Sequence, residues 1–299
     1  MHKEFSLKKI KNKNEIQQFV ELLGNSFEIK PGTSFIDDFP IWLEGSKQNV
    51  ELLGAFDGNR LVASTGVRKA QCQISDKMLS VGIIGAVATC KEYRGKKLAS
   101  ELIKMVIKQA ELDEQTLLIL WGPERNLYKR FGFELCGIQC RGKIEPFIND
   151  KKIMTVNEGW TDDIFPLLKK RDGGLKLLDK DKGWIKKHKN ILWLWTKNNN
   201  GICAYLAIGK GIDLKNIIHE WGGDEEDLKT LLSYAAKKYP NVEMIMPEDK
   251  MYALAPPTFQ YYKEHLCMIK IINTEELKRG FPKHVLETGT EKIKASDVF

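Results

Sequence analysis

The stretch VATCKEYRGKKLAS, residues 87–100, joins an apolar run to an amphipathic segment through a short basic turn. The turn holds a single glycine, Gly95, and apolar residues recur at helical spacing from Lys96 to about Glu111. This pattern predicts a strand, a tight turn and a helix in direct succession. Basic side chains are unfavourable at the positive end of a helix dipole. The turn is therefore either a solvated loop or a cradle for a phosphate-bearing ligand.

Strand-like and helix-like segments alternate through the first half of the chain. We expect a short strand at residues 5–10 and a helix at residues 14–27 capped by Asn14. Residues 50–74 predict a hairpin with the sequence DGN as its turn. The remaining predicted elements are strands at residues 78–89, 116–122 and 132–147 and a short helix at residues 124–131.

The second half of the chain predicts a similar order of elements after a polar, turn-rich stretch near residue 150. A hairpin and a third strand are expected within residues 193–223, then a helix at 224–239 and a strand at 242–247. This order indicates a structural repeat. We expect two mixed α/β domains, residues 1–150 and 151–299, the second a degenerate copy of the first.

Composition narrows the class of protein. The chain has 299 residues, 42% of them hydrophobic, with no apolar run of membrane-spanning length and a charged N-terminal stretch unlike a secretory signal. The formal net charge is +7, but the lysines are spread along the chain, which argues against specific nucleic-acid binding. The scattered cysteines predict reduced thiols in a cytoplasmic protein and no metal site. They are Cys72, Cys90, Cys136, Cys140, Cys203 and Cys267.

The basic turn has the features of a phosphate site. Free N–H groups at a helix start attract anions, and Gly95 lets the backbone approach a phosphate without a side chain in the way. Arg94, Lys96 and Lys97 add positive charge there. The corresponding helix in the second half begins with the acidic run 224–227, which would repel a pyrophosphate. We therefore expect one anion site per chain.

Residues 81–134 resemble the core of the GCN5-related N-acetyltransferases (GNAT). The pyrophosphate loop of that family reads Gln/Arg-x-x-Gly-x-Gly/Ala, and Glu92 to Lys97 occupy it here. Glu92 stands where Gln or Arg is usual, and Lys97 replaces the second small residue. The stretch NLYKRFGFE, residues 126–134, is similar to a later motif of the family. The two-domain layout, LYKRFGF and HEWGGD resemble the enhanced-intracellular-survival acetyltransferases, whose third, sterol-carrier-like domain we do not expect here.

The resemblance implies tandem GNAT-like domains, each a mixed twisted sheet flanked by helices. It implies acetyl-coenzyme A as the acyl donor, bound only in the first domain, between the strand ending at Thr89 and the strand 116–122. An amine would attack the thioester directly, without an acyl-enzyme or a metal, and Tyr128 would protonate the leaving thiolate. The implied cofactor-binding residues are Val87, Ala88, Thr89, Arg94, Gly95, Lys96, Lys97, Leu98, Ala99 and Asn126.

Two roles remain open at this point. Tyr128 could instead be a core aromatic beside Phe131 and Phe133. The general base is not identified, and water could relay the proton. His219 and Glu220 should point to opposite faces of a strand and so make a poor pair. Other candidates are Asp37, Asp38 and Glu44, in the segment that usually lines the acceptor site, and the C-terminal carboxylate of Phe299.

Three alternatives concern function. The chain could be a non-catalytic module that senses coenzyme A or scaffolds a partner, which the departures at Glu92 and Lys97 favour. It could transfer amino acids from charged tRNA, although that family usually lacks the glycine turn. The acyl group could differ from acetyl, and the acceptor could be a polyamine, an aminoglycoside-like molecule, a lysine side chain or a peptide N-terminus. No membrane partner is expected, and a homo-oligomer is left open.

Overall fold

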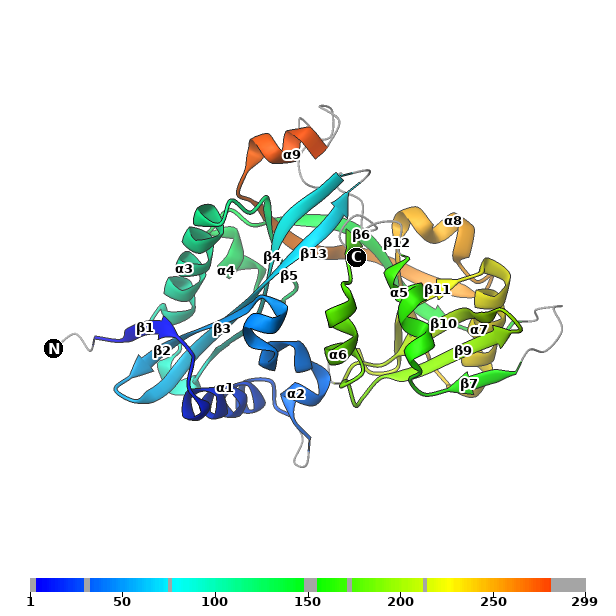
Figure 1. Ribbon diagram of the computed structural model, residues 1–299, viewed down its shortest axis with the longest axis horizontal. Coiled ribbons are helices and arrows are strands. Elements are labelled where there is room, and N and C mark those ends of the chain that lie inside the picture. The colour runs from blue at the N-terminus through cyan, green and yellow to red at the C-terminus, as the bar shows by residue number, and fades with distance from the viewer. Residues whose placement is uncertain are drawn as a thin grey trace. The chain divides into compact units, whose positions relative to one another are not determined.

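The fold is mixed α/β, with strands flanked by helices, in a computed structural model that describes residues 4–29, 33–74, 77–147, 155–170, 174–211 and 214–280 (Figure 1). The chain forms two compact units. The first combines residues up to Leu135 with a segment that begins at Cys267, and the second extends from Cys136 to Leu266. The boundary expected near residue 150 falls within residues 148–154, which lie outside the described part.

The sheet of the first unit has the strand order β1-β2-β3-β4-β5-β13. Neighbouring strands from β1 to β4 are antiparallel, β4 and β5 are parallel, and the end of β13 is antiparallel to β5. The hairpin with the DGN turn is present, with Asp57 opposite Arg60 and Gly58 at φ +59°. The strands are β1 (Ser6–Lys9), β2 (Val50–Asp57), β3 (Arg60–Ile74), β4 (Lys77–Thr89), β5 (Leu117–Leu120) and the last part of β13 (Phe259–Ile271), whose residues before Cys267 belong to the second unit.

Helices cover both faces of this sheet. Leu53 of β2 packs in one cluster with Leu102 of α3, whereas the adjacent Leu52 packs in another with Phe19 of α1. Because side chains alternate along a strand, α1 and α3 lie on opposite faces. The helical segments are α1 (Lys13–Ser26), α2 (Phe35–Asp38), η1 (Pro40–Leu43), η2 (Gly45–Gln48), η3 (Lys91–Tyr93), α3 (Leu98–Leu112), α4 (Arg125–Lys129) and α9 (Thr274–Gly280).

The first helix begins at Lys13, one residue before the expected range, and its cap is Asn12 rather than Asn14. The Asn12 side chain accepts a hydrogen bond from the Glu15 N–H at 2.9 Å. The Glu15 carboxylate in turn accepts from the N–H groups of Lys11 and Asn12 and from the Lys8 ammonium. This reciprocal capping box satisfies the first donors of the helix, and these bonds lower the pKa of Glu15 to about 2.

The second unit has the strand order β6-β12-β11-β10-β9-β7. The hairpin, strand, helix and strand expected between residues 193 and 247 are all present, with α7 joining the parallel strands β11 and β12. These elements are β6 (Glu134–Ile144), β7 (Val156–Glu158), β9 (Leu192–Asn198), β10 (Gly201–Ile208), β11 (Ile217–Gly223), α7 (Glu225–Lys238) and β12 (Glu243–Pro247). That this unit is a degenerate copy of the first remains a prediction.

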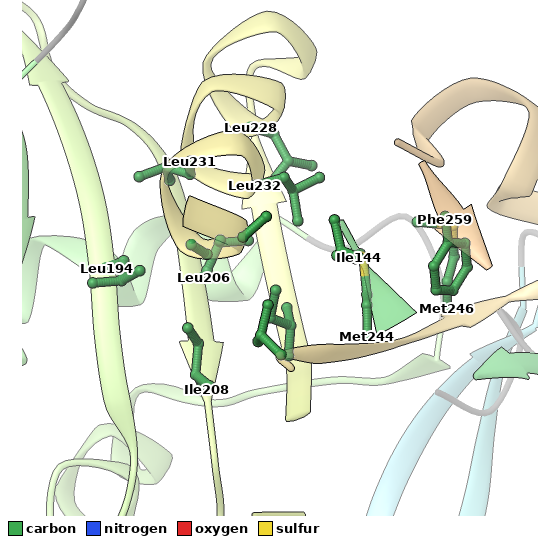
Figure 2. Close-up of a cluster of buried hydrophobic side chains, with 14 of the residues drawn as sticks. Ile144, Leu194, Leu206, Ile208, Leu228, Leu231, Leu232, Met244, Met246 and Phe259 are labelled. Carbon is green, nitrogen blue, oxygen red and sulfur yellow. The ribbon is translucent and has the colours of Figure 1, made fainter. Parts of the chain in front are cut away.

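The core of the second unit lies between α7 and the strands. Figure 2 shows Leu228, Leu231 and Leu232 of α7 directed toward strand residues such as Leu206. A second cluster, which includes Trp193 and Tyr205, packs against the shorter helical segments. The shorter elements are η4 (Asp162–Ile164), α5 (Phe165–Lys169), β8 (Gly174–Leu175), η5 (Asp179–Asp181), α6 (Lys182–Ile185), η6 (Glu248–Lys250) and α8 (Met251–Leu254).

The sequence predicts reduced cysteines, no metal site and no membrane-spanning segment. All six cysteines lie in the described ranges, and all are free thiols. In the part of the chain that the structure describes, no three or more His, Cys, Asp or Glu residues gather as a metal-binding group. Within the same ranges, no helix combines the length and apolar character needed to cross a membrane.

Candidate active site

A bulge interrupts β4 just before its end. The register with β3 shifts between the pairs Ser64–Ala88 and Gly66–Gly85, and Ala86 has φ +53°. Ile84 packs in the cluster with α3, yet Ala86 and Ala88 pack in the cluster with α1. In a regular strand these three side chains would share one face. One extra residue has therefore reversed the alternation, as a β-bulge does.

The bulge coincides with the place where β4 and β5 stop pairing. Their parallel ladder extends from Val81–Leu117 to Ile84–Leu120, where β5 ends, whereas β4 continues to Thr89. Residues 85–89 thus form a stretch of strand beyond the ladder with β5. Backbone N–H and C=O groups in such a stretch need partners, and an amide-bearing ligand arm can supply them.

The turn after β4 contains two residues in the left-handed region. Gly95 has φ +80°, and Lys97, the N-cap of α3, has φ +62° and makes no side-chain cap. The first described bond into the helix joins the Glu101 N–H to the Lys97 carbonyl at 3.1 Å. Among the described residues, no acceptor faces the N–H groups of Gly95 or of residues 97–100. A Cβ built on Gly95 would meet no described atom within 4 Å, so the described part of the chain leaves the space over this backbone open.

Two charged side chains of the turn, Lys96 and Glu92, contact other described residues, whereas Arg94 and Lys97 form no ion pair with them. Lys96 lies over the Tyr93 ring, with its ammonium nitrogen 4.5 Å from the ring centroid. Glu92 is 62% exposed and pairs with Arg60 at 3.0 Å, so its carboxylate is held by the β2–β3 hairpin. Arg94 and Lys97 are exposed and have no ion pair within the described ranges. The turn therefore presents positive charge, with its one carboxylate already paired.

Tyr93 fastens the turn to the sheet. Its hydroxyl donates to the Asp57 carboxylate at 2.6 Å, and its ring meets the Phe5 ring edge-on at a centroid distance of 6.0 Å. The Arg60 guanidinium lies 5.6 Å from the centroid of the same ring. These contacts fix the turn from its sheet side, which leaves the Gly95 backbone open on the other.

Lys97 carries a conformational cost that a substitution can remove. A left-handed residue other than glycine costs about 1–2 kcal/mol, and glycine adopts the same φ without strain. We expect Lys97→Gly to raise the free energy of unfolding by about 1 kcal/mol in urea titrations. Lys96→Gly is the matched control, since Lys96 is not left-handed and the change should destabilise instead. A lower free energy of unfolding in Lys97→Gly than in the wild type would contradict backbone strain at Lys97.

Tyr128 lies on α4, close to the end of β5. Its side chain is 6% exposed and belongs to the same core cluster as Leu98 and Val87. A Cβ on Gly122, two residues past β5, would lie 3.9 Å from the Tyr128 hydroxyl oxygen. The ring also meets Phe133 edge-on, so the core position that the sequence left as an alternative is observed. Among the described residues, the hydroxyl has no hydrogen-bond partner.

Burial, and secondarily the charge of Glu124, raise the pKa of Tyr128 to about 12 from an ordinary value of 10.0. The unfolded chain should then lose this phenolic proton before the folded chain does. Stability should fall as the pH rises from about 10 to 12, by up to about 3 kcal/mol. Unfolding free energies measured at pH 9 and pH 11.5 should show a smaller fall in Tyr128→Phe than in the wild type. An equal fall in both would contradict the raised pKa.

The other expected cofactor residues are arranged around these features. Ala88 is buried toward α1, Val87 packs on the α3 side, and Thr89 ends β4. Leu98 is buried in the first turn of α3, and Ala99 follows it, half-buried. Asn126 is exposed on α4, two residues before Tyr128, so the two side chains leave the helix in different directions. Residues 87–89 thus end β4 and residues 94–99 lead into α3, with η3 between them.

Most candidate bases have structural partners. Asp37 accepts from the Ser34 N–H at 3.2 Å in the capping box of α2, and Asp38 is buried. In the second unit, His219 contacts the Gly209 carbonyl, whereas Glu220 accepts from the Tyr205 hydroxyl, so the two have separate partners. Glu44 is only half-buried, directly after η1. Phe299 lies outside the described residues.

The corresponding place in the second unit is closed by its own side chains. The Asp224 carboxylate accepts from the N–H groups of Glu226 and Asp227 at 3.1 and 3.3 Å, which caps α7. The β11–β12 ladder stops at Ile218–Met244, and beyond it the Trp221 indole donates to the Ile245 carbonyl at 3.4 Å. The cap on α7 leaves fewer N–H groups free to bind an anionic ligand. The Trp221 indole also bridges the gap beyond the ladder.

Comparisons with known proteins address the family directly. Residues 7–136 match the family model described as "Acetyltransferase (GNAT) domain". These residues form a GNAT acetyltransferase domain. The match ends at the last residues of the first segment of unit one, and it contains both the β4–α3 turn and Tyr128. A comparison with curated proteins found no match.

Solved structures share the fold of most of the GNAT-containing chain. A probable N-acyltransferase from Enterococcus faecalis V583 is 17% identical at a TM-score of 0.70, over 93% of this chain and 75% of that one. Eis1 from Mycobacterium abscessus is 10% identical at a TM-score of 0.66, over 93% of this chain and 76% of that one. N-myristoyltransferase from Saccharomyces cerevisiae was solved with bound myristoyl-CoA. It is 11% identical at a TM-score of 0.55, over 90% of this chain and 83% of that one. At these identities the likeness shows the fold alone.

Two features of the GNAT domain went unrecognised in the sequence. The Trp42 indole packs against the facing glycines Gly66 and Gly85, and a Cβ on Gly85 would lie 2.4 Å from the ring. Two glycines in adjacent predicted strands are the signal that could have indicated a close-packed aromatic there. The second is Glu124, which follows Pro123 in the connection from β5 to α4 and whose negative charge contributes to the raised pKa of Tyr128.

Proposed function

We propose that the chain is an N-acetyltransferase that moves an acetyl group from acetyl-coenzyme A to a primary amine. One observation carries the proposal. The strand that parts from its neighbour at Ile84 leads into a turn where, among the described residues, nothing lies over Gly95 and no acceptor faces the N–H groups at the start of α3. GNAT acyltransferases use acyl-coenzyme A donors and act on amine acceptors, and residues 7–136 belong to such a domain.

Each part of the donor has a complementary part of the chain. The amide groups of the pantetheine arm would pair with the backbone of Val87, Ala88 and Thr89, beyond the ladder with β5. The pyrophosphate would accept hydrogen bonds within the turn 94–99, chiefly from the N–H groups of Gly95 and residues 97–99, because those of Arg94 and Lys96 already donate to the Lys91 and Tyr93 carbonyls. The dipole of α3 favours negative charge there. The exposed cations Arg94 and Lys97 add attraction for the phosphates, and Asn126 would contact the donor from α4.

The reaction would proceed by direct attack of the amine on the thioester carbonyl. The carbon–nitrogen bond forms, the carbon–sulfur bond breaks, and Tyr128 donates its proton to the departing sulfur. A pKa of about 12 keeps that phenol protonated at neutral pH, which is the form a general acid needs. Acetyl is proposed as the acyl group because the resemblance implies it, and a longer acyl chain is tested separately.

Calorimetric titration with acetyl-coenzyme A tests the donor, and coupled detection of released thiol tests the transfer. We expect one donor site per chain, and thiol release that depends on an amine from a panel of spermidine, kanamycin, a lysine-containing peptide and a peptide with a free N-terminus. Myristoyl-coenzyme A serves as the long-chain competitor. Absence of acetyl-coenzyme A binding would overturn the proposal. Binding without transfer to any amine would favour a coenzyme A sensor.

A further inference from the structure

The connection between β5 and α4 contains a carboxylate that has no structural role among the described residues. Glu124 is the N-cap of α4, yet its side chain makes no cap hydrogen bond. It is exposed, and in the described part of the chain it has neither an ion pair nor a hydrogen-bond partner. An acidic residue at a helix start normally accepts from the first N–H groups. The Glu124 carboxylate is left available for another contact.

The connection that contains Glu124 lies close to the Tyr128 hydroxyl, because a Cβ on Gly122, two residues before Glu124, would lie 3.9 Å from that oxygen. Glu124 itself precedes the helix, with φ −78° and ψ 50°, and Tyr128 follows four residues later within α4. The Leu127 N–H donates to the Glu124 carbonyl at 2.9 Å, which closes a turn between the two residues. The negative charge of Glu124 contributes to the raised pKa of Tyr128, which places the carboxylate within electrostatic reach of the phenol. Both residues thus lie within eight residues of the end of β5 along the chain.

A second observation points to a ligand at this connection. Trp121, the first residue after β5, is 44% exposed, although large aromatic side chains are usually buried. The face of an indole attracts cations, and so does a carboxylate. An amine that binds at this connection would have an exposed indole and an exposed carboxylate available within four residues of the chain.

We propose that Glu124 is the catalytic base of the transfer, a carboxylate that takes a proton from the attacking amine; this inference rests on the acetyltransferase function proposed above. As the nitrogen–carbon bond forms, the N–H becomes more acidic and its proton moves to Glu124. The carbon–sulfur bond breaks with its electron pair on sulfur, which takes the Tyr128 proton. Glu124 then returns its proton to the Tyr128 phenolate, directly or through water. Amine and thioester have become amide and thiol, and both residues are restored.

Three variants test this assignment with acetyl-coenzyme A and the amines spermidine and acetyl-Gly-Lys-Gly-amide as probes. A positioned general base contributes about 10²- to 10⁴-fold. We expect Glu124→Gln to lower kcat at least about 100-fold while the Kd for acetyl-coenzyme A stays within about twofold. Glu124→Asp should recover about tenfold of the loss. Glu111→Gln, the same change at an exposed position on α3, should match the wild type.

The outcomes separate this inference from the proposed function. If the wild type acetylates either probe and Glu124→Gln stays within about threefold of it, Glu124 is not the base and the acetyltransferase stands. If Glu124→Gln instead weakens acetyl-coenzyme A binding in parallel with kcat, its role is structural and the inference fails. If the wild type binds acetyl-coenzyme A but acetylates no probe, both the transfer and the base are overturned. Melting temperatures of all variants check that the fold is retained.

Discussion

Replacing Gly95 with tryptophan should abolish measurable binding of acetyl-coenzyme A. Gly95 has φ +80°, a conformation that side-chain-bearing residues rarely adopt, and the space above it is open. An indole there would occupy the position proposed for the pyrophosphate, and the strain would disturb the turn. The loss of several charge-assisted hydrogen bonds corresponds to at least about 100-fold in Kd. Calorimetric titration of the variant and the wild type measures it.

Gly159→Trp is the matched control for this experiment. Gly159 lies in the second unit, has φ +91° and also faces open space, so the same substitution imposes a similar backbone strain. Its Kd for acetyl-coenzyme A should equal that of the wild type. Wild-type binding at one site per chain, lost only in Gly95→Trp, would support the cradle. Retained binding in Gly95→Trp would place the donor elsewhere.

Local sequence signals predicted most elements of both units. The DGN turn, the helical stripe after Gly95 and the apolar run before Gly122 each depend on neighbours in sequence, and each element is present. The cap of α1 was wrong by two residues, because Asn12 and Asn14 are both good caps and the choice depends on the Glu15 carboxylate. Such a choice lies in a reciprocal hydrogen bond that composition alone does not specify.

The features that define the candidate site depend on pairing between distant segments. The bulge at Ala86 appears only when β4 is aligned with β3, and its sequence contains no glycine at the bulged position. The end of β13, residues 268–271, lies beside β5 although about 150 positions separate them in the chain. No periodicity within either strand indicates that neighbour. Sequence motifs identified the turn, and the structure added the parting of β4 and β5 beside it.

The electrostatics of the turn also needed the structure. Glu92 is the residue that most disfavours a phosphate in the sequence, and an inward carboxylate would weaken the cradle. Its pairing with Arg60 across the β2–β3 hairpin holds it and lowers its pKa, chiefly through hydrogen bonds from its own backbone and from Arg60. An exposed pair of this kind adds little stability. Its consequence for the turn is the neutralised charge, which leaves Arg94 and Lys97 to act on a ligand.

Tyr128→Phe should lower kcat by about 10²- to 10³-fold and leave the Kd for acetyl-coenzyme A within about twofold. The phenyl ring keeps the packing against Phe133, so the fold and the donor site are preserved. The raised pKa of Tyr128 makes its proton transfer to sulfur unfavourable by itself. A phenol of pKa about 12 gives its proton to a thiolate of pKa about 8.5 only against a gradient of about 5 kcal/mol.

Because this proton transfer to sulfur is unfavourable by itself, a second group should return a proton to the Tyr128 phenolate as the first one leaves. Glu124, which has just taken a proton from the amine in the proposed step, can do so. The loss in Tyr128→Phe and the loss in Glu124→Gln should then not multiply. The double variant should be only slightly slower than either single variant, because each change interrupts the same proton circuit. Tyr261→Phe, at an exposed tyrosine of the second unit, is the control. Fully multiplicative losses would show that the two side chains act independently, and an unchanged kcat in Tyr128→Phe would leave the phenol as core packing alone.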